Sequence, residues 1–164
     1  MVTRTLKDLF IHSLSDIYSA EKQMTKSLPK MARAATSPNL RSAFETHLEE
    51  TQGQIIRIDQ VVEASGIKLQ RIKCVAMEGL VEEGQEQIAE IEKGPVLDTA
   101  LIASAQKVEH YEIASYGSLI ALAKQLGETA AVELLAETLK EEKATDDKLS
   151  LLAEEKVAAE ALGK

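Results

Sequence analysis

Sequence elements that could end a helix are sparse in this chain. Four stand out, and they are the Ser-Pro-Asn at 37–39, Ser65-Gly66, Gly94-Pro95 and Gly127. Between them apolar residues recur at steps of three and four, which is the period of one helix face. Aromatic residues make up only 3% of the chain, while Ala, Leu, Glu and Lys dominate, and this composition favours helices over strands. The sequence therefore predicts an all-α protein with long helices.

The breaks divide the chain into four long expected helices and one long connection. The expected helices cover about 6–35, 38–65, 96 or 97 to 126, and 128 to the late 150s. In the first of them the apolar stripe continues through Pro29, which predicts a kink and not a break. Gly127 is expected to cap the third helix at its C-terminus. Residues 158–164 are expected to form a frayed tail.

The connection at 66–95 decides how the helices are arranged. Its middle reads AMEGLVEEGQEQIAEIE, with Leu80, Ile88 and Ile91 on one side, and predicts a short fifth helix. Short links make each flanking pair of helices an antiparallel hairpin, whereas about thirty residues can run the length of a bundle. We therefore expect one domain over residues 1–164, a ferritin-like four-helix bundle with a single long crossover. A simple up-down bundle is the alternative, and it would require the fifth helix to pack elsewhere.

Carboxylates interrupt the apolar stripes at matched depths. Glu21 and Glu112 occupy slots that the spacing reserves for apolar residues, and Glu109 lies one turn before Glu112. The two halves of the chain also resemble each other, because Glu21 and Glu50 are 29 positions apart, as are Glu112 and Glu141 (50 − 21 and 141 − 112). Each long helix therefore brings at least one acid toward mid-bundle.

Further polar candidates share these helix faces. They are His47, Glu50 and Gln54 in the second expected helix, and Glu141, Glu142 and Asp146 in the fourth. Ionised carboxylates are costly in a protein interior unless they are paired, and the Lys and Arg residues gather at helix ends or outer faces. Two divalent ions bridged by carboxylates would account for this many acids, with iron or manganese preferred to zinc. The alternative for any single glutamate is a solvated helix face, and for His47 it is an ordinary core or surface histidine.

Charge and composition limit the partners and the compartment. The net charge of −8 and the pI near 5.0 disfavour binding to nucleic acid, since the surface repels phosphate. No segment approaches the roughly 20 apolar residues of a membrane span, and the start MVTRTLKDLF does not read as a signal peptide. The single cysteine, Cys74, excludes a disulfide within the chain and fits a reducing cytoplasm.

Five runs of residues resemble a known family. They are LSDIYSAEKQ, HLEETQGQIIRID, KCVAMEGLVEEG, QKVEHYEIASYG and ETLKEEKATD. In this order, and over nearly the whole chain, they resemble the YciF-type bacterial stress proteins of the ferritin-like, rubrerythrin-related superfamily. The resemblance implies a ferritin-like bundle, a homodimer and a di-iron site.

By position, the resemblance also implies a ligand set. Its carboxylates are Glu21, Glu50, Glu109, Glu112 and Glu142. The pair Glu109 and Glu112 is similar to the extra glutamate pair in the third helix of rubrerythrin. Ferritin-like di-iron proteins commonly carry Glu-x-x-His on their second and fourth helices, but here Gly53 follows Glu50 and Thr145 follows Glu142 at that spacing. His47 lies upstream instead, so the expected site is rich in oxygen.

The sequence thus supports two functional hypotheses. In the first, the chain is a cytoplasmic stress protein that binds two iron ions, or manganese, and oxidises Fe(II) with peroxide or oxygen. Glu50 and either Glu141 or Glu142 would bridge the ions, and Glu21 and Glu112 would bind one each. The remaining candidates, Glu109, Gln54, Asp146 and His47, would complete or orient the coordination. In the second hypothesis the chain is a non-enzymatic homodimer, and the acids form a buried network.

Overall fold

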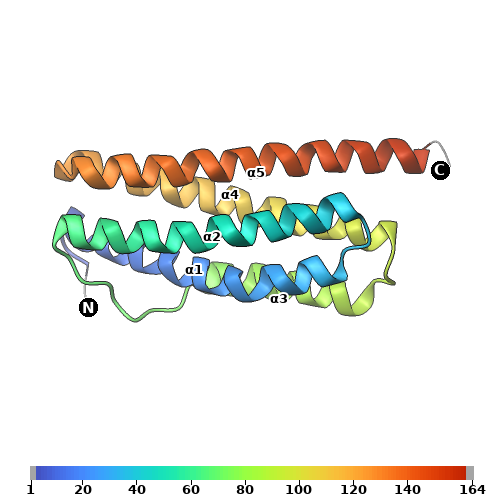
Figure 1. Ribbon diagram of the computed structural model, residues 1–164. Coiled ribbons are helices and arrows are strands. Elements are labelled where there is room, and N and C mark those ends of the chain that lie inside the picture. The colour runs from blue at the N-terminus through green and yellow to red at the C-terminus, as the bar shows by residue number, and fades with distance from the viewer. Residues whose placement is uncertain (1–2, 162–164) are drawn as a thin grey trace.

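Helices make up almost the whole of the structure. The computed structural model describes the backbone of residues 3–161 and the side chains of residues 3–155. Over that range it holds no strand and five helices: α1 Leu6–Ala34, α2 Pro38–Ser65, α3 Val75–Glu90, α4 Pro95–Leu126 and α5 Thr129–Ala161 (Figure 1). The prediction of an all-α protein is confirmed. The predicted fraying from 158 onward is wrong for 158–161, which continue α5, and residues 162–164 lie outside the described part.

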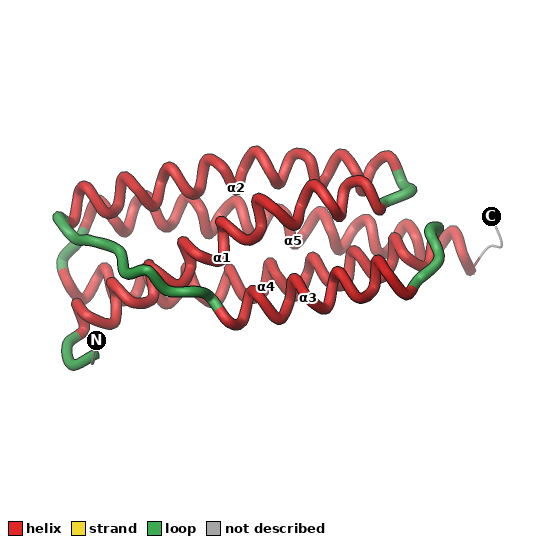
Figure 2. Tube along the Cα trace, turned by 90° about the horizontal axis from the view of Figure 1, so that it is seen from below, coloured by secondary structure: helices red, strands yellow, loops and turns green. Residues whose placement is uncertain are grey.

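The helices form two antiparallel hairpins joined by one crossover. α1 packs against α2, α4 packs against α5, and the hairpins meet through α1 with α4 and α2 with α5. From the end of α2 the chain returns along the outside of the bundle as a loop and then as α3, so that α4 starts at the opposite end (Figures 1 and 2). α3 packs on α1 and α4 of its own chain. This is the predicted ferritin-like topology, and the up-down alternative is excluded.

Local sequence accounts for where the helices begin and end. Thr5 caps α1, because its side chain accepts from the Asp8 backbone while the Asp8 carboxylate accepts from the Thr5 backbone. Gly66 and Gly127 end α2 and α4 with φ of 59° and 73°, a left-handed conformation that favours glycine. Pro29 lies within α1, which runs on to Ala34 without a break, as predicted.

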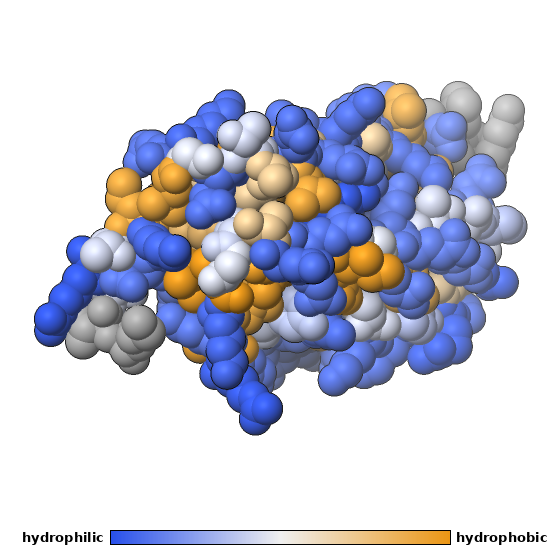
Figure 3. Space-filling model, turned by 60° about the vertical axis from the view of Figure 1, so that its left-hand side comes forward, coloured by the Kyte–Doolittle hydropathy of each residue, from blue (hydrophilic) through white to orange (hydrophobic). Residues whose placement is uncertain are grey.

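Most buried side chains are apolar, and the large apolar side chains that are exposed include Leu6 and Leu9 in α1, Val96 in α4 and Leu151 in α5. Ile102 is 1% exposed and belongs to the core. Ile56 of α2, in contrast, is 60% exposed. Figure 3 shows apolar side chains at the surface over the end of the bundle where α1 begins, and Leu6 and Leu9 are both exposed there.

A buried carboxylate joins the two hairpins at the α1–α2 turn. Asp98, in the first turn of α4, is 0% exposed. Its Oδ1 accepts from the Thr36 backbone at 2.7 Å, and its Oδ2 accepts from the Thr36 hydroxyl at 2.6 Å and from the Ser37 backbone at 2.9 Å. Because these donors belong to the turn between α1 and α2, Asp98 holds that turn against the start of α4.

Replacing Asp98 should therefore destabilise the whole bundle. We expect Asp98→Ala to lower the free energy of unfolding by roughly 2–4 kcal/mol, since it leaves two backbone N–H groups of the turn without an acceptor. Urea unfolding followed by circular dichroism measures the change. Asp147→Ala, at an exposed position of α5, is the matched control and should lie within about 0.5 kcal/mol of the wild type. Equal midpoints for the two variants would contradict the assigned role.

Candidate metal centre

Acidic side chains from all four long helices meet in the interior of the bundle. The participating residues are Glu21 from α1, His47 and Glu50 from α2, Glu109 and Glu112 from α4, and Glu142 from α5. Except for Glu50, whose side chain is 35% exposed, each of them is at most 3% exposed. Steps of three between His47 and Glu50, and between Glu109 and Glu112, place each pair on one helix face.

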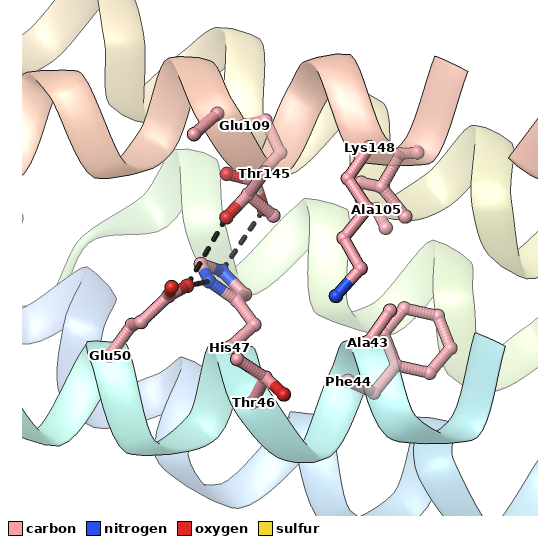
Figure 4. Close-up of a pocket in the computed structure, with 11 residues that line it drawn as sticks. Ala43, Phe44, Thr46, His47, Glu50, Ala105, Glu109, Thr145 and Lys148 are labelled. Carbon is pink, nitrogen blue, oxygen red and sulfur yellow. Dashed lines mark hydrogen bonds and ion pairs between the residues drawn. The ribbon is translucent and has the colours of Figure 1, made fainter. Parts of the chain in front are cut away.

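His47 lies among three of these carboxylates. Its Nε2 is 3.0 Å from Glu109 Oε1 and 4.0 Å from Glu142 Oε2, and its Nδ1 is 3.4 Å from Glu50 Oε2. Thr145 donates to the same Glu50 oxygen at 3.3 Å. Figure 4 shows the His47 ring rising from α2 toward Glu109, with Glu50 and Thr145 beside it.

Most of the interior oxygen atoms have no hydrogen-bond donor. One potential ligand atom each from His47, Glu109, Glu112 and Glu142 lies within 4.8 Å of the others. Among the described residues, the buried carboxylate and amide oxygens without a hydrogen bond are Glu21 Oε2, Gln54 Oε1, Glu109 Oε2, Asp146 Oδ1 and both oxygens of Glu112 and Glu142. Buried acceptors ordinarily have partners. A set of converging, unpartnered oxygens with one imidazole nitrogen fits a hard or borderline divalent cation such as iron or manganese.

A tyrosine buried beside the cluster holds one of the acids. The Tyr116 hydroxyl donates to Glu21 Oε1 at 2.5 Å, and Tyr116 is 0% exposed. Tyr116 lies one turn after Glu112 on α4. Its bond leaves Glu21 Oε2 as the oxygen that faces no donor.

The electrostatics of the cluster favour protons in the absence of metal. Burial raises the pKa of Glu21 to about 7, even though the bond from Tyr116 acts in the opposite direction. Burial, followed by the charges of neighbouring carboxylates, raises the pKa of Glu112 and of Glu142 well above the ordinary carboxyl value. Burial disfavours the charged form of His47, yet Glu109 and Glu50 raise its pKa well above that of free imidazole. The cluster therefore carries protons that a bound cation would displace.

Gln54 and Asp146, two further predicted ligands, lie at the edge of the cluster. Glu141, the alternative to Glu142, is turned away from it. Glu141 binds Arg57 through both carboxylate oxygens, so it is Glu142 that α5 directs inward. Gln54 is 0% exposed and donates to Glu141. Asp146 Oδ2 lies 3.1 Å from Nε2 of the exposed His110, and Asp146 is not among the four residues whose ligand atoms converge.

Neither Arg57 nor Lys148 was among the residues that the sequence predicted for the site. The chain carries a signal for Arg57, since it lies three residues after Gln54 on the same face of α2, and Glu137 and Glu141 are one turn apart on α5. Its three acceptors, Glu137, Thr138 and Glu141, all come from α5. No local pattern indicates which α5 residues it meets.

A small cavity connects the cluster with the surface. Its volume is about 110 Å³, and its walls combine apolar side chains such as Phe44 and Leu149 with His47, Glu50 and Glu109. Lys148 is exposed and also lines it. In Figure 4 the Lys148 side chain reaches down from α5 toward α2, between His47 and Phe44.

The fold and the cluster together define a ferritin-like helical-bundle protein with a buried acid site. Comparison with known families then identifies the group. A family model described as "Domain of unknown function (DUF892)" matches residues 5–162, and the chain belongs to this family. Protein YciF of Escherichia coli (strain K12) is 63% identical over 154 residues, which are 93% of this chain and 93% of that protein.

Solved structures agree with this assignment. The crystal structure of the E. coli stress protein YciF superposes with a TM-score of 0.93 at 62% identity, covering 95% of this chain and 99% of that one. YcfI from Rhodopseudomonas palustris gives a TM-score of 0.87 at 50% identity, over 90% and 94% of the two chains. A Xanthomonas campestris protein shares the fold, with a TM-score of 0.74 at 23% identity over 94% and 95%. None of the helices, over the residues described, is long and apolar enough to cross a membrane.

The raised pKa values predict how stability depends on pH in metal-free protein. Below pH 4.5, the ordinary value for a glutamate, Glu21 is protonated in both the folded and the unfolded chain. As pH rises toward 7 the unfolded chain releases this proton first, so folding stability falls. Glu112, Glu142 and His47 shift in the same direction. We expect the Tm in EDTA to fall between pH 5 and pH 8. Each kcal/mol lost from the free energy of unfolding should lower it by roughly 2–4 °C.

Differential scanning calorimetry across this range gives the slope. Glu21→Gln removes one titrating group and should flatten it, whereas Glu49→Gln, one residue from Glu50 but exposed, should leave it unchanged. A wild-type Tm that rises from pH 5 to pH 8 would contradict the raised pKa values.

Proposed function

We propose that the chain binds two divalent metal ions in the interior of its bundle, with iron as the most suitable metal and manganese as the second choice. The observation that carries this proposal is the set of buried carboxylate oxygens without a donor, on Glu21, Glu109, Glu112 and Glu142. Two ions are invoked because one cation leaves too much negative charge in the interior.

The balance of charge supports two ions. Four carboxylates are fully buried, and Glu50 contributes a fifth at the cavity. His47 is the only imidazole among them. Two divalent cations would supply four positive charges and bring the site close to neutrality, which a low-dielectric interior requires.

Each ligand has a role in this proposal. Glu50 and Glu142, on facing helices, would hold the two ions together with Glu21 and Glu112. Glu109 and Gln54 would complete the coordination, and His47 would bind through the nitrogen nearest Glu109. Among the α5 candidates the contacts support Glu142 over Glu141, because Arg57 already occupies both Glu141 oxygens. Asp146, which meets His110, would act from outside the coordination sphere.

An iron pair would supply one-electron redox chemistry toward oxygen or peroxide. The chain's own residues would do the rest. The aliphatic core excludes bulk water, Tyr116 orients Glu21, and His47 is placed to hold a proton beside Glu50. The cavity is large enough only for a small reactant. A role in stress is supported by the relative YciF, which is described as a stress protein.

The proposal extends to the domain, the oligomeric state, the compartment and the partners of the chain. We take residues 1–164 as one domain of a cytoplasmic homodimer whose partners are metal ions, not nucleic acid or membrane. The composition, the single cysteine and the acidic surface support this view.

The second candidate is a non-enzymatic homodimer with a metal-free acid network. It is favoured by contacts that hold the acids without any ion, namely Tyr116 to Glu21, and His47 among Glu50 and Glu109. In that case the exposed apolar residues at the start of α1 would serve the partner interface.

Metal analysis separates the two candidates. After anaerobic loading with Fe(II) and desalting, the wild type should retain about two ions per chain. Glu112→Gln removes a buried ligand and should lower retention to one ion or fewer. Glu49→Gln, exposed on α2, should retain as much iron as the wild type. Fewer than one ion per chain, with no difference between Glu112→Gln and the wild type, would leave the metal-free network as the explanation.

Thermal stability gives an independent measurement. A metal that binds only the folded chain should raise the Tm with increasing concentration, by about 2.7 kcal/mol of stability at one hundred times its Kd. Calorimetry with Mn²⁺ avoids oxidation during the scan. We expect Glu50→Gln to reduce the rise and Glu49→Gln to preserve it. A Tm independent of Mn²⁺ up to millimolar concentration would contradict binding, and sedimentation at the same protein concentration tests the dimer.

A further inference from the structure

The side-chain amide of Gln54 is buried, and a hydrogen bond at its NH₂ group sets its orientation. It is 0% exposed, and its Nε2 donates to Glu141 Oε2 at 3.1 Å. The Glu141 carboxylate also accepts from Arg57 Nη1 at 3.0 Å and from Arg57 Nη2 at 2.9 Å. A carboxylate paired with a guanidinium is an acceptor only. The NH₂ group of Gln54, and not its carbonyl, must therefore face Glu141.

The other end of the amide is left without a partner. Gln54 Oε1 is buried and accepts no hydrogen bond. Buried amide oxygens are normally satisfied, and rotating the amide by 180° would only bring two oxygen atoms together at Glu141. The same condition holds for the interior oxygens of Glu112 and Glu142. Gln54 lies one turn beyond Glu50 and two beyond His47 on the same face of α2.

We propose that Arg57 and Glu141 are positioning residues of the metal site, and that they present the carbonyl oxygen of Gln54 to a metal ion as a neutral ligand. This inference rests on the proposed metal-binding function. The inference goes beyond that function because it assigns a role to Arg57 and Glu141, which do not themselves bind metal. It also gives a reason why Glu141 is turned away while its neighbour Glu142 faces inward.

A neutral ligand suits the charge of the site. The buried carboxylates already match the charge of two divalent ions, so a further glutamate at position 54 would leave an uncompensated negative charge in the interior. The amide adds a ligand oxygen without adding charge. The positive charge of Arg57 does not oppose a nearby cation, because Glu141 and Glu137 neutralise it, with N–O distances of 2.9 and 3.0 Å.

Arg57 has a second acceptor that allows a matched control. Its Nη2 donates to Glu137 as well as to Glu141, but the amide of Gln54 donates to Glu141 and not to Glu137, whose side chain is 61% exposed. Glu141→Ala and Glu137→Ala each remove one carboxylate partner of Arg57. Only Glu141→Ala frees the amide of Gln54.

The test is a double-mutant cycle on Mn²⁺ affinity, with free Mn²⁺ counted by electron paramagnetic resonance. Gln54→Leu keeps the size of the side chain and removes its oxygen, and should raise the Kd of the weaker bound ion at least about 10-fold. Glu141→Ala should raise it about 10-fold as well, within the range seen when groups that orient ligands are lost. Glu137→Ala should change it less than about 3-fold. The double variant Gln54→Leu with Glu141→Ala should match Gln54→Leu alone within about 2-fold, because Glu141 acts only through Gln54.

The outcomes distinguish this inference from the proposed function. If the wild type binds Mn²⁺ with the expected loss in Glu112→Gln, but Gln54→Leu binds it equally well, the positioning role is wrong and the metal site stands. If the effects of Gln54→Leu and Glu141→Ala multiply, Glu141 acts through general stability and the inference is again overturned. If the wild type binds no Mn²⁺, both proposals fail together. Calorimetry of each metal-free variant verifies that it is folded before affinity is compared.

Discussion

The burial of carboxylates at mid-bundle is the constraint on which the rest of this structure depends. Glu21, Glu109, Glu112 and Glu142 lie in a region from which the aliphatic core excludes water. Their charge is tolerated there only if it is neutralised by protons, by His47 or by cations. At this level acids take the place of apolar side chains that would otherwise stabilise the core. The helices must therefore be held together by other contacts.

Several features of the fold supply these contacts. The crossover lays α3 along α1 and α4, and Asp98 joins the turn between α1 and α2 to the start of α4. Arg57 links α2 to α5 through three side chains of α5. These contacts join the hairpins at the end of the bundle and near its middle, so the acids cannot move apart to reach water without breaking them.

The helices and much of the site could be predicted from sequence because their signals are local. Steps of three and four define a helix face whatever the partner is, and an acid in such a stripe is visible as an exception. Glu21 and Glu112 were identified in this way. The same spacing indicated Glu50, Glu109 and either Glu141 or Glu142, and the resemblance to the family implied Glu142 for the last of these.

Contacts between distant segments could not be predicted in this way. Arg57 and Glu141 are 84 positions apart, and Gln54 and Glu141 are 87 apart. Nothing in either local pattern indicates that they meet. Ile102 belongs to the core whereas Ile56 is exposed, because burial depends on which neighbouring helix covers a face and not on the period of that face alone.

Glu141 and Glu142 show most clearly what the sequence determines and what only the tertiary structure decides. Sequence by itself determined that α5 is a helix and that it brings an acid to the depth of Glu21, Glu50 and Glu112, since helical period and chain length are local properties. Adjacent residues on a helix point about 100° apart, so only one of the two can face the interior. That choice was decided by tertiary structure, because the rotation of α5 is set by its packing against α2 and α4 and by the side chain of Arg57.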